Sequence, residues 1–292
     1  MSAAAWLLLA LLGACSPAAI LNATAPHEGI VLHADLAYAP GPDHGLDVYA
    51  PVQPRADAPV VVFFYGGDWQ SGARAMYRFV GAALAARGIV TVIPDYRRYP
   101  AVRFPAFMRD AAAAVAWTRA HVGAYGGDAA RLFLMGHSAG AQIATLLALD
   151  GQYLREAGVD PCDIAGVIGL AGPYDFLPLH DATLKVIFGP PADWPRSQPI
   201  DFVTPAAPPM LLAAGTDDHT VDPGNTVRLA ARLRAAGVEA DERLYPDIGH
   251  PVLIGAFAWP LAFLAPVRRD TQRFIAEHPA PTPRPACKRA EG

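Results

Sequence analysis

The chain predicts an α/β fold in which a mostly parallel sheet carries helices on both faces. Short, continuous apolar runs, typical of strands buried on both faces, alternate along the sequence with segments of helical periodicity. Such alternation indicates βαβ units and therefore parallel strands. The 292 residues, 53% of them hydrophobic, are enough for one large domain with a sizeable core. We find no internal repeat and no interdomain linker.

The apolar runs and the helical periodicity give the expected elements in order. The strands are expected at residues 30–38, 46–49, 59–64, 89–93, 132–135, 165–170, 210–214 and 240–244. The helices are expected at residues 76–87, 107–122, 139–149, 225–236 and 263–276. Pro40-Gly41-Pro42 separates the first two strands, which indicates a hairpin-like opening of the sheet.

One stretch, Pro173 to Pro205, departs from the alternation. It is rich in proline and in aromatic residues, including Tyr174, Phe188 and Trp194. Two interpretations stay open, a small lid-like insertion over the site and a plain irregular loop.

The first residues predict a targeting segment rather than part of the fold. Ala3 to Leu12 is an apolar block, too short for the roughly 20 residues that cross a bilayer but typical of a signal peptide. The following Leu-Gly-Ala-Cys resembles a bacterial lipobox, which implies cleavage after residue 14 and lipidation of Cys15. We therefore expect an exported protein, lipid-anchored in a bacterial cell envelope and facing the periplasm. The segment before the block lacks Lys and Arg, so a plain secretory signal or a buried apolar N-terminus are the alternatives.

The remaining boundaries follow from composition. Residues 15–28 are expected to be a linker, residues 29–278 the folded domain, and residues 279–292 a proline-rich tail. After Cys15 only Cys162 and Cys287 remain. They could pair in an oxidising compartment, and two unpaired thiols are the alternative.

Charge and motif content exclude several classes of function. The net charge is −4 and no run of Lys or Arg occurs, which argues against a nucleic-acid surface. The sequence contains no P-loop, no G-x-G-x-x-G after a strand, no H-E-x-x-H and no C-x-x-C. Phosphate, dinucleotide and zinc chemistry have no support, and we expect neither cofactor nor metal.

A candidate nucleophile lies where the apolar run at residues 132–135 ends in Gly-His-Ser-Ala-Gly and a helical pattern follows at once. This is the G-x-S-x-G elbow in its strand, turn and helix context. Gly136 and Gly140 leave room where a Cβ would clash, so that Ser138 can sit on a strained turn. The N–H of Ala139, at the start of the helix, could help to bind an oxyanion. A serine N-cap on an ordinary helix is the alternative.

A serine nucleophile needs a general base, and the chain has nine histidines. His250 is the best placed, because Asp247-Ile248-Gly249-His250 follows the last expected strand and is expected to form a loop at the carboxyl edge of the sheet. The others lie near the ends, at the end of a surface helix, in the 173–205 stretch, beside the nucleophile or beside the acid: His27, His33, His44, His278, His121, His180, His137 and His219.

The acid that orients this base is expected in the polar turn after the strand at residues 210–214. Asp218 is the preferred candidate and Asp217 its chief rival, with Asp175 and Asp247 behind them. The order serine, acid, histidine along the chain is that of α/β-hydrolases and differs from the other serine hydrolase folds.

The donors for an oxyanion are expected in Tyr65-Gly66-Gly67-Asp68-Trp69, which follows the first buried strand. An ordinary glycine turn after a strand is the alternative.

Taken together, these motifs resemble the α/β-hydrolase superfamily, in particular the carboxylesterase branch with an HGGGW-type motif. This branch includes hormone-sensitive-lipase-like, feruloyl-esterase-like and arylformamidase-like proteins. The resemblance covers residues 46–276 and rests on motifs in family order: YGGDWQSG, PDYRRYP, YGGD at 125–128, LMGHSAGA and GTDDHTV.

The resemblance implies the α/β-hydrolase fold, an oxyanion hole formed by the N–H groups of Gly67, Asp68 and Ala139, and a triad of Ser138, Asp218 and His250. Two departures stand in the oxyanion loop, because Tyr65 replaces the histidine of the motif and Asp68 its third glycine.

The resulting prediction is a serine esterase that cleaves a small carboxylic ester through an acyl-enzyme. The nearest alternatives are an arylformamidase, which would hydrolyse N-formylkynurenine, and an isoprenylcysteine methylesterase. From other classes, we retain a catalytically silent, envelope-anchored binding protein on a hydrolase scaffold and a structural lipoprotein.

Overall fold

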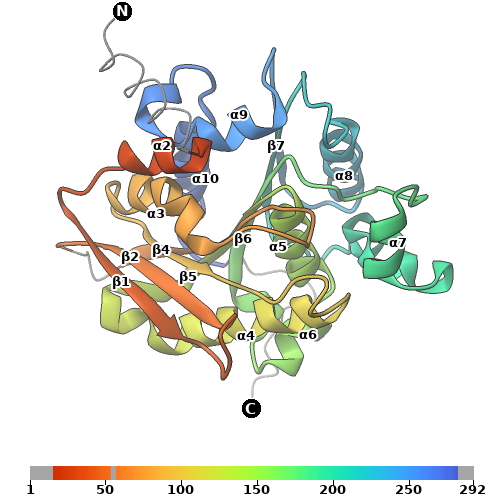
Figure 1. The fold of residues 1–292 in the computed structure, drawn as a ribbon, viewed down its shortest axis with the longest axis horizontal. Helices are drawn as coiled ribbons and strands as arrows, with labels where there is room; N and C mark the ends of the chain where they lie inside the picture. The colour runs from red at the N-terminus through yellow and green to blue at the C-terminus, as the bar shows by residue number, and fades with distance from the viewer. Residues whose placement is uncertain (1–15, 54–56, 282–292) are drawn as a thin grey trace, which may run out of the picture.

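The computed structural model describes residues 16–53 and 57–281. Its centre is an eight-stranded sheet with the order β1-β2-β4-β3-β5-β6-β7-β8 (Figure 1). β1 and β2 are antiparallel to their neighbours, and all later neighbours are parallel. The strands are β1 (Ile30–Ala37), β2 (Gly45–Pro51), β3 (Ala58–Phe64), β4 (Val90–Pro94), β5 (Gly127–His137), β6 (Ile164–Leu170), β7 (Met210–Gly215) and β8 (Ala240–Tyr245).

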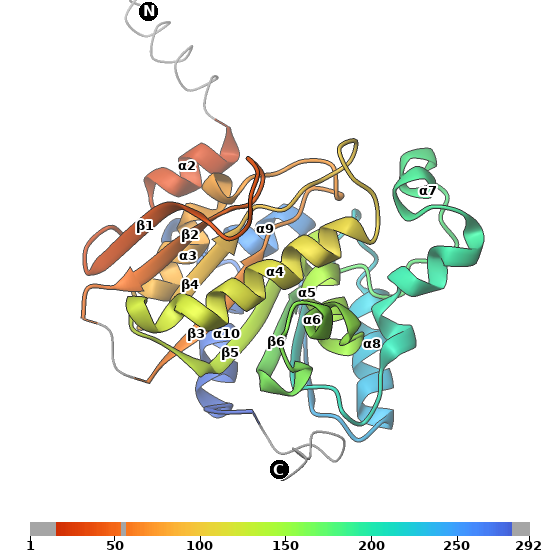
Figure 2. The ribbon, with the colours of Figure 1, turned by 90° about the horizontal axis from the view of Figure 1, so that it is seen from below.

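Helices cover both faces of this sheet, as the sequence predicts. α4, α5, α6 and α8 lie on one face, and α3 and α10 lie on the other (Figures 1 and 2). The α-helices are α2 (Pro17–Ala23), α3 (Arg78–Ala85), α4 (Ala106–His121), α5 (Ala139–Leu149), α6 (Gln152–Glu156), α7 (Ala182–Phe188), α8 (Gly224–Ala235), α9 (His250–Gly255) and α10 (Val267–Glu277). Short 3₁₀ turns are η1 (Arg74–Tyr77), η2 (Val122–Tyr125), η3 (Pro161–Asp163), η4 (Pro191–Ser197), η5 (Pro199–Phe202) and η6 (Trp259–Leu261).

The register of the two central strands positions the site. β3 and β5 are parallel neighbours, and Phe64 at the end of β3 lies opposite Gly136 near the end of β5. Residues 60–64 of β3 and 132–137 of β5 are buried, as expected for strands covered on both faces. The loop after β3 and the turn after β5 therefore leave the sheet side by side at its carboxyl edge.

The structure corrects three expected boundaries. The helix expected from residue 76 starts as η1 and becomes α3 only at Arg78. The last helix begins at Val267 rather than at residue 263, because Pro266 occupies its N-cap and Pro260 lies in η6. Within the expected linker 15–28, Pro17–Ala23 forms α2, with the Ser16 hydroxyl accepting a hydrogen bond from the Ala19 N–H.

The 173–205 stretch is built from short helical pieces rather than one irregular loop. It contains α7, η4 and η5, and α7 stands out from the body of the molecule at the side away from β1 (Figure 1).

Several predictions fall on the ends of the chain. The signal segment with Cys15, and the tail with Cys287, lie outside the described residues. Cys162 is disulfide-bonded. No helix within residues 16–53 and 57–281 has the length and apolarity needed to span a bilayer.

Candidate active site

Ser138 lies on a strained elbow between β5 and α5. Its φ of 57° and ψ of −128° are unusual for a residue with a side chain. The Ser138 N–H donates to the Leu170 carbonyl of β6 at 2.9 Å, which ties the turn to the sheet. A Cβ on Gly136 would lie 2.1 Å from the Gly140 carbonyl oxygen, and a Cβ on Gly140 would lie 2.1 Å from that of Phe64. Both glycines of the motif are therefore required by direct backbone contact.

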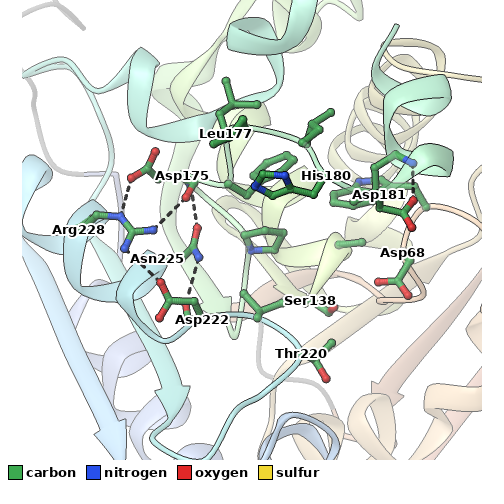
Figure 3. A pocket seen from close by; sticks show the side chains of 18 residues that line it. Asp68, Ser138, Asp175, Leu177, His180, Asp181, Thr220, Asp222, Asn225 and Arg228 are labelled. Atoms are coloured by element: carbon green, nitrogen blue, oxygen red, sulfur yellow. Dashed lines mark hydrogen bonds and ion pairs between the residues drawn. The ribbon is translucent and has the colours of Figure 1, made fainter. Parts of the chain in front are cut away.

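The loop after β3 packs against this elbow. A Cβ on Gly66 would come within 2.8 Å of the Ser138 Cβ, so only glycine fits there. Gly67, Asp68 and Trp69 all have positive φ, and the Gly67 carbonyl accepts from the Gln70 and Ser71 N–H groups. The reversal of the chain brings Asp68 to the same cavity that Ser138 and Ala139 line (Figure 3). Gly67, the third expected oxyanion donor, is not among the residues that line the cavity and lies directly before Asp68 in the chain.

Asp218 and His250 form the expected acid–base pair. Nδ1 of His250 lies 2.7 Å from Oδ2 of Asp218, whose side chain is fully buried. The other oxygen, Oδ1, accepts from the Thr220 and Val221 N–H groups at 2.9 Å each. Because a carboxylate only accepts, Nδ1 of His250 is the donor, which leaves the lone pair of Nε2 available as a base.

The rival acids have other partners. The Asp217 side chain is 63% exposed and faces His219. Asp175 pairs with Arg228, while the exposed Asp247 stands in a turn with a φ of 58°. The side chains of Asp217 and Asp218 point in different directions from the same turn, and of the two it is Asp218 that hydrogen-bonds His250.

His250 itself differs from its expected setting. It is the first residue of α9, with Gly249 as the N-cap, and not part of an open loop. Pro251 in the first turn helps this short helix to begin directly after the β8 turn.

His137, set aside in the sequence because it neighbours the nucleophile, contacts the base. Its ring lies 4.6 Å from that of His250, and its Nε2 is 3.2 Å from the His250 carbonyl oxygen. Burial, together with the neighbouring His250, lowers the pKa of His137 to about 3. His137 is therefore neutral at ordinary pH and packs beside His250 without charge repulsion.

Tyr65, which replaces the histidine of the motif, belongs to a buried polar network. Its hydroxyl donates to Asp95 at 2.8 Å and accepts from Arg98 at 2.8 Å. The Tyr96 hydroxyl donates to the Tyr65 carbonyl at 2.7 Å, and the two rings stack. Burial, with the nearby Tyr96 and Asp95, raises the pKa of Tyr65, so the phenol stays protonated. These contacts fix the start of the loop after β3.

The cavity in front of Ser138 has a volume of about 560 Å³ (Figure 3). One wall comes from Trp69 and from residues 173–205, called the lid stretch below, and is largely apolar although it also carries Asp175, His180 and Asp181. The other wall is polar and comes from the loop after β7 and the start of α8. The lining residues are Asp68, Trp69, Ser138, Ala139, Pro173, Asp175, Phe176, Leu177, Pro178, Leu179, His180, Asp181, Leu184, Thr220, Val221, Asp222, Asn225 and Arg228.

Gln142 joins three parts of the site, and the sequence analysis missed it. Its side-chain oxygen accepts from Trp69 Nε1 at 3.1 Å, and its nitrogen donates to the Ser197 carbonyl of the lid stretch at 2.8 Å. The Trp69 ring packs against Phe176 and Phe188. A fully buried amide in the otherwise apolar first turn of α5 was the available signal.

Asn225 and Arg228 of α8 bind the start of the lid stretch and hold it next to the loop after β7, which carries Asp218 and Asp222. The Asn225 oxygen accepts from the N–H groups of Tyr174 and Asp175 at 2.9 and 2.8 Å. Arg228 binds Asp175 and lies 3.2 Å from Asp222 (Figure 3). The arginine is thus already engaged by two carboxylates.

Among the described residues, no group of three or more His, Cys, Asp or Glu side chains is arranged to hold a metal ion.

Known proteins resemble this chain in sequence. Esterase LipC of Mycobacterium tuberculosis is 32% identical over 279 residues, which cover 86% of this chain and 69% of that protein. Isoprenylcysteine alpha-carbonyl methylesterase ICME of Arabidopsis thaliana is 28% identical over 237 residues, 74% of this chain and 55% of that protein. The chain spans about half the length of these plant relatives.

Solved structures share the fold. A truncated carbohydrate esterase from gut microbiota superposes with a TM-score of 0.76 at 22% identity, covering 87% of this chain and 99% of that one. Inhibited esterase B from Lactobacillus rhamnosis gives 0.76 at 21% identity and covers 94% of each chain.

The family model BD-FAE matches residues 46–233, more than half of the sequence, and spans both the oxyanion loop and the elbow. The chain therefore belongs to the BD-FAE family of α/β-hydrolase esterases.

Proposed function

We propose that this chain hydrolyses small carboxylic esters, with Ser138 as the nucleophile, His250 as the general base and Asp218 as the acid that orients it. The backbone N–H groups of Gly67, Asp68 and Ala139 are the proposed oxyanion hole. The observation that carries the proposal is the buried Asp218–His250 hydrogen bond, together with Ser138 on its strained elbow at the cavity.

The chemistry follows from these roles. Nε2 of His250 takes the hydroxyl proton as Ser138 Oγ attacks the ester carbonyl, and the carbonyl oxygen becomes an oxyanion that the loop donors bind. Collapse breaks the bond to the alkoxy oxygen, which His250 protonates, and the alcohol leaves. Water, activated by His250, then attacks the acyl-enzyme and releases the acid. Asp218 stabilises the imidazolium in both halves.

The cavity supports an uncharged or cationic substrate. Its four carboxylates outnumber its one arginine, which already binds two of them. The Gly224 N–H and Arg228 lower the pKa of Asp222, so this carboxylate is ionised at neutral pH. An anionic ester would be repelled by these carboxylates, which come from several sides of the cavity. The carboxylates are Asp68, Asp175, Asp181 and Asp222.

A second candidate is the hydrolysis of a methyl ester on a larger molecule. It is favoured by the plant relatives, which are named isoprenylcysteine alpha-carbonyl methylesterases. The apolar lid-side wall, with Phe176 and Leu184, would suit an apolar group next to such an ester.

The proposed location is a bacterial envelope, with the chain exported and lipid-anchored at Cys15. The support is the apolar block at residues 3–12 and the lipobox-like sequence that follows it. Radiolabelled palmitate should enter the wild-type protein but not Cys15→Ser, and equal labelling would contradict the anchor.

The first test is steady-state hydrolysis of p-nitrophenyl esters from acetate to laurate. We expect activity that falls with acyl length, because the cavity is small, and that is lost in Ser138→Ala. A methyl ester of a prenylated cysteine and N-formylkynurenine, assayed in parallel, separate the alternatives. Identical rates for the wild type and Ser138→Ala would instead favour a binding protein.

The acid assignment has its own test. Asp218→Asn should lower kcat by about 10⁴-fold, because the amide no longer holds the correct tautomer of His250. Asp217→Asn, at an exposed neighbour, is the matched control and should stay within about threefold of the wild type. The opposite ranking would overturn the assignment.

The charge of the preferred substrate is tested with acetyl thioesters whose thiol part carries a positive, a neutral or a negative group. Kinetics of the cationic thiocholine, neutral mercaptoethanol and anionic mercaptopropionate esters should show kcat/KM falling in that order. Raising the salt concentration should reduce the differences in kcat/KM among the three esters, because salt screens the charges. A preference for the anionic ester would refute the electrostatic argument.

A further inference from the structure

The two most exposed large hydrophobic side chains of the described residues lie together, away from the cavity of Ser138. Phe263 is 81% exposed and Trp259 is 69% exposed, and Leu264 beside them is 40% exposed. All three belong to the segment between α9 and α10. This segment packs beside α2, on whose outer side Ile20 is 51% exposed (Figure 1). We call α2 and residues 256–266 the N-terminal corner.

A hollow of about 540 Å³ separates the two parts of this corner, and two arginines line it. Arg87 and Arg268 face the hollow together with Trp259, Thr24 and His27. Glu28 also lines it, but no carboxylate of residues 16–53 and 57–281 forms an ion pair with either arginine. Burial, and the neighbouring charge of Arg87, lower the pKa of Arg268. Two cations that repel each other in one hollow would be stabilised by an anion.

The chain outside the described residues narrows the choice of occupant. Cys15 is bonded directly to Ser16, the N-cap of α2, and the apolar block at residues 3–12 lies a few residues earlier. Any bilayer that holds either feature is within a few residues' reach of α2, at roughly 3.5 Å of chain per residue. Exposed Trp and Phe beside cations are typical of surfaces that insert into the headgroup region.

We propose that the N-terminal corner docks on an anionic phospholipid surface, with Trp259 and Phe263 at the acyl boundary and a lipid phosphate between Arg87 and Arg268. The proposal takes from the proposed location only the presence of a bilayer. It is independent of whether the chain is an esterase. Figures 1 and 2 show α7, which contributes Leu184 to the cavity, at the right and α2 toward the left, so α7 lies well away from the proposed docking corner.

Hydrogen exchange of the full chain tests the contact directly. Vesicles of phosphatidylcholine with phosphatidylglycerol should slow exchange in residues 257–265 at least about fivefold, while α7 serves as the internal control and is unchanged. Pure phosphatidylcholine should slow it less, and inorganic phosphate at equal concentration should have no effect. Slowing by inorganic phosphate, slowing by a tenfold increase in protein concentration alone, or no slowing with either vesicle would each overturn the proposal, the second in favour of self-association.

Variants of the full chain assign the residues, since residues 1–15 are the same in all of them. Trp259→Ser with Phe263→Ser should weaken partition into anionic vesicles tenfold or more, by roughly the burial energy of two aromatic side chains. Val227→Ser with Leu244→Ser, at other exposed apolar positions, is the matched control and should leave vesicle partition unchanged.

Arg87→Gln should weaken binding about fivefold on anionic vesicles only, and Arg155→Gln is its control. Equal loss in test and control pairs would refute the assignment. Esterase activity is not the readout, so a failure here is distinguishable from a failure of the proposed function.

Discussion

Two regions that border the cavity are built in different ways: the turn at residues 136–140 with the loop after β3, called the elbow wall, and the lid stretch with the residues that hold it, called the lid wall. The elbow wall depends on close approach to backbone atoms and to the Ser138 Cβ, which only glycine at Gly66, Gly136 and Gly140 allows. The lid wall is held by side chains, through the amides of Gln142 and Asn225 and the rings around Trp69. The backbone geometry of the elbow wall is therefore fixed by steric contact, which suits a part of the site that must hold Ser138 in one position. The lid wall can change by side-chain substitution, which suits a specificity surface.

The largest effect should come from closing the space at the elbow. In Gly140→Ala the new Cβ would lie 2.1 Å from the Phe64 carbonyl oxygen, and neither backbone can move without distorting β3. We expect a loss of about 3 kcal/mol or more in the free energy of unfolding, measured by urea denaturation, and loss of esterase activity. Gly123→Ala, where a Cβ has open space, is the matched control. If Gly140→Ala were as stable as Gly123→Ala, the claim that steric contact at the backbone fixes the elbow wall would be refuted.

A smaller effect is expected at the link between the walls. Gln142→Leu keeps the size of the side chain but leaves Trp69 Nε1 and the Ser197 carbonyl without their partner. The expected cost is about 2 kcal/mol in the free energy of unfolding, from two unpaired buried groups. The spread of kcat/KM across the acyl series should change more than the rate on acetate. The matched control is Gln152→Leu, because Gln152 hydrogen-bonds Asp150 outside the cavity. It should change neither the free energy of unfolding nor the spread of kcat/KM by a comparable amount.

The smallest effect for a single step of the experiment, one pH unit, is a pH dependence of stability that comes from His137, beside the elbow. Unfolded His137 binds a proton below about pH 6.5, whereas the folded residue does so only near its pKa of about 3. Stability should therefore fall as the pH drops below 6.5, by up to about 1.4 kcal/mol per unit from this group.

Urea unfolding at pH 7, 6 and 5 measures this slope. His137→Gln should flatten it relative to the wild type, whereas His121→Gln, at an exposed histidine, should leave it unchanged. Equal slopes in the wild type and His137→Gln would show that His137 is not held neutral by burial.

Much of the fold could be predicted because its signals are local. The strands β3, β6 and β7 are continuous runs without a polar side chain, β4 is interrupted only by Thr91, and burial on both faces favours that pattern. The last helix was expected four residues too early, and α9 was not expected, since His250 was placed in a loop. Pro251 and Pro266 lie where these two helices begin. The seven-residue α2 has too few turns for a clear periodicity.

The sequence by itself indicated the elbow through its G-x-S-x-G pattern, and the steric requirement for glycine at Gly136 acts within five residues, against Gly140. The requirement at Gly140 comes from Phe64, which only the tertiary structure brings next to it. It also ordered the serine, the acid and the histidine along the chain. Only the tertiary structure shows that His250 hydrogen-bonds Asp218, the preferred candidate, and that the neighbouring Asp217 faces His219 instead. It alone joined Gln142 to Ser197, 55 residues later. Such contacts depend on which buried polar groups meet once the chain is packed, and no local pattern encodes that meeting.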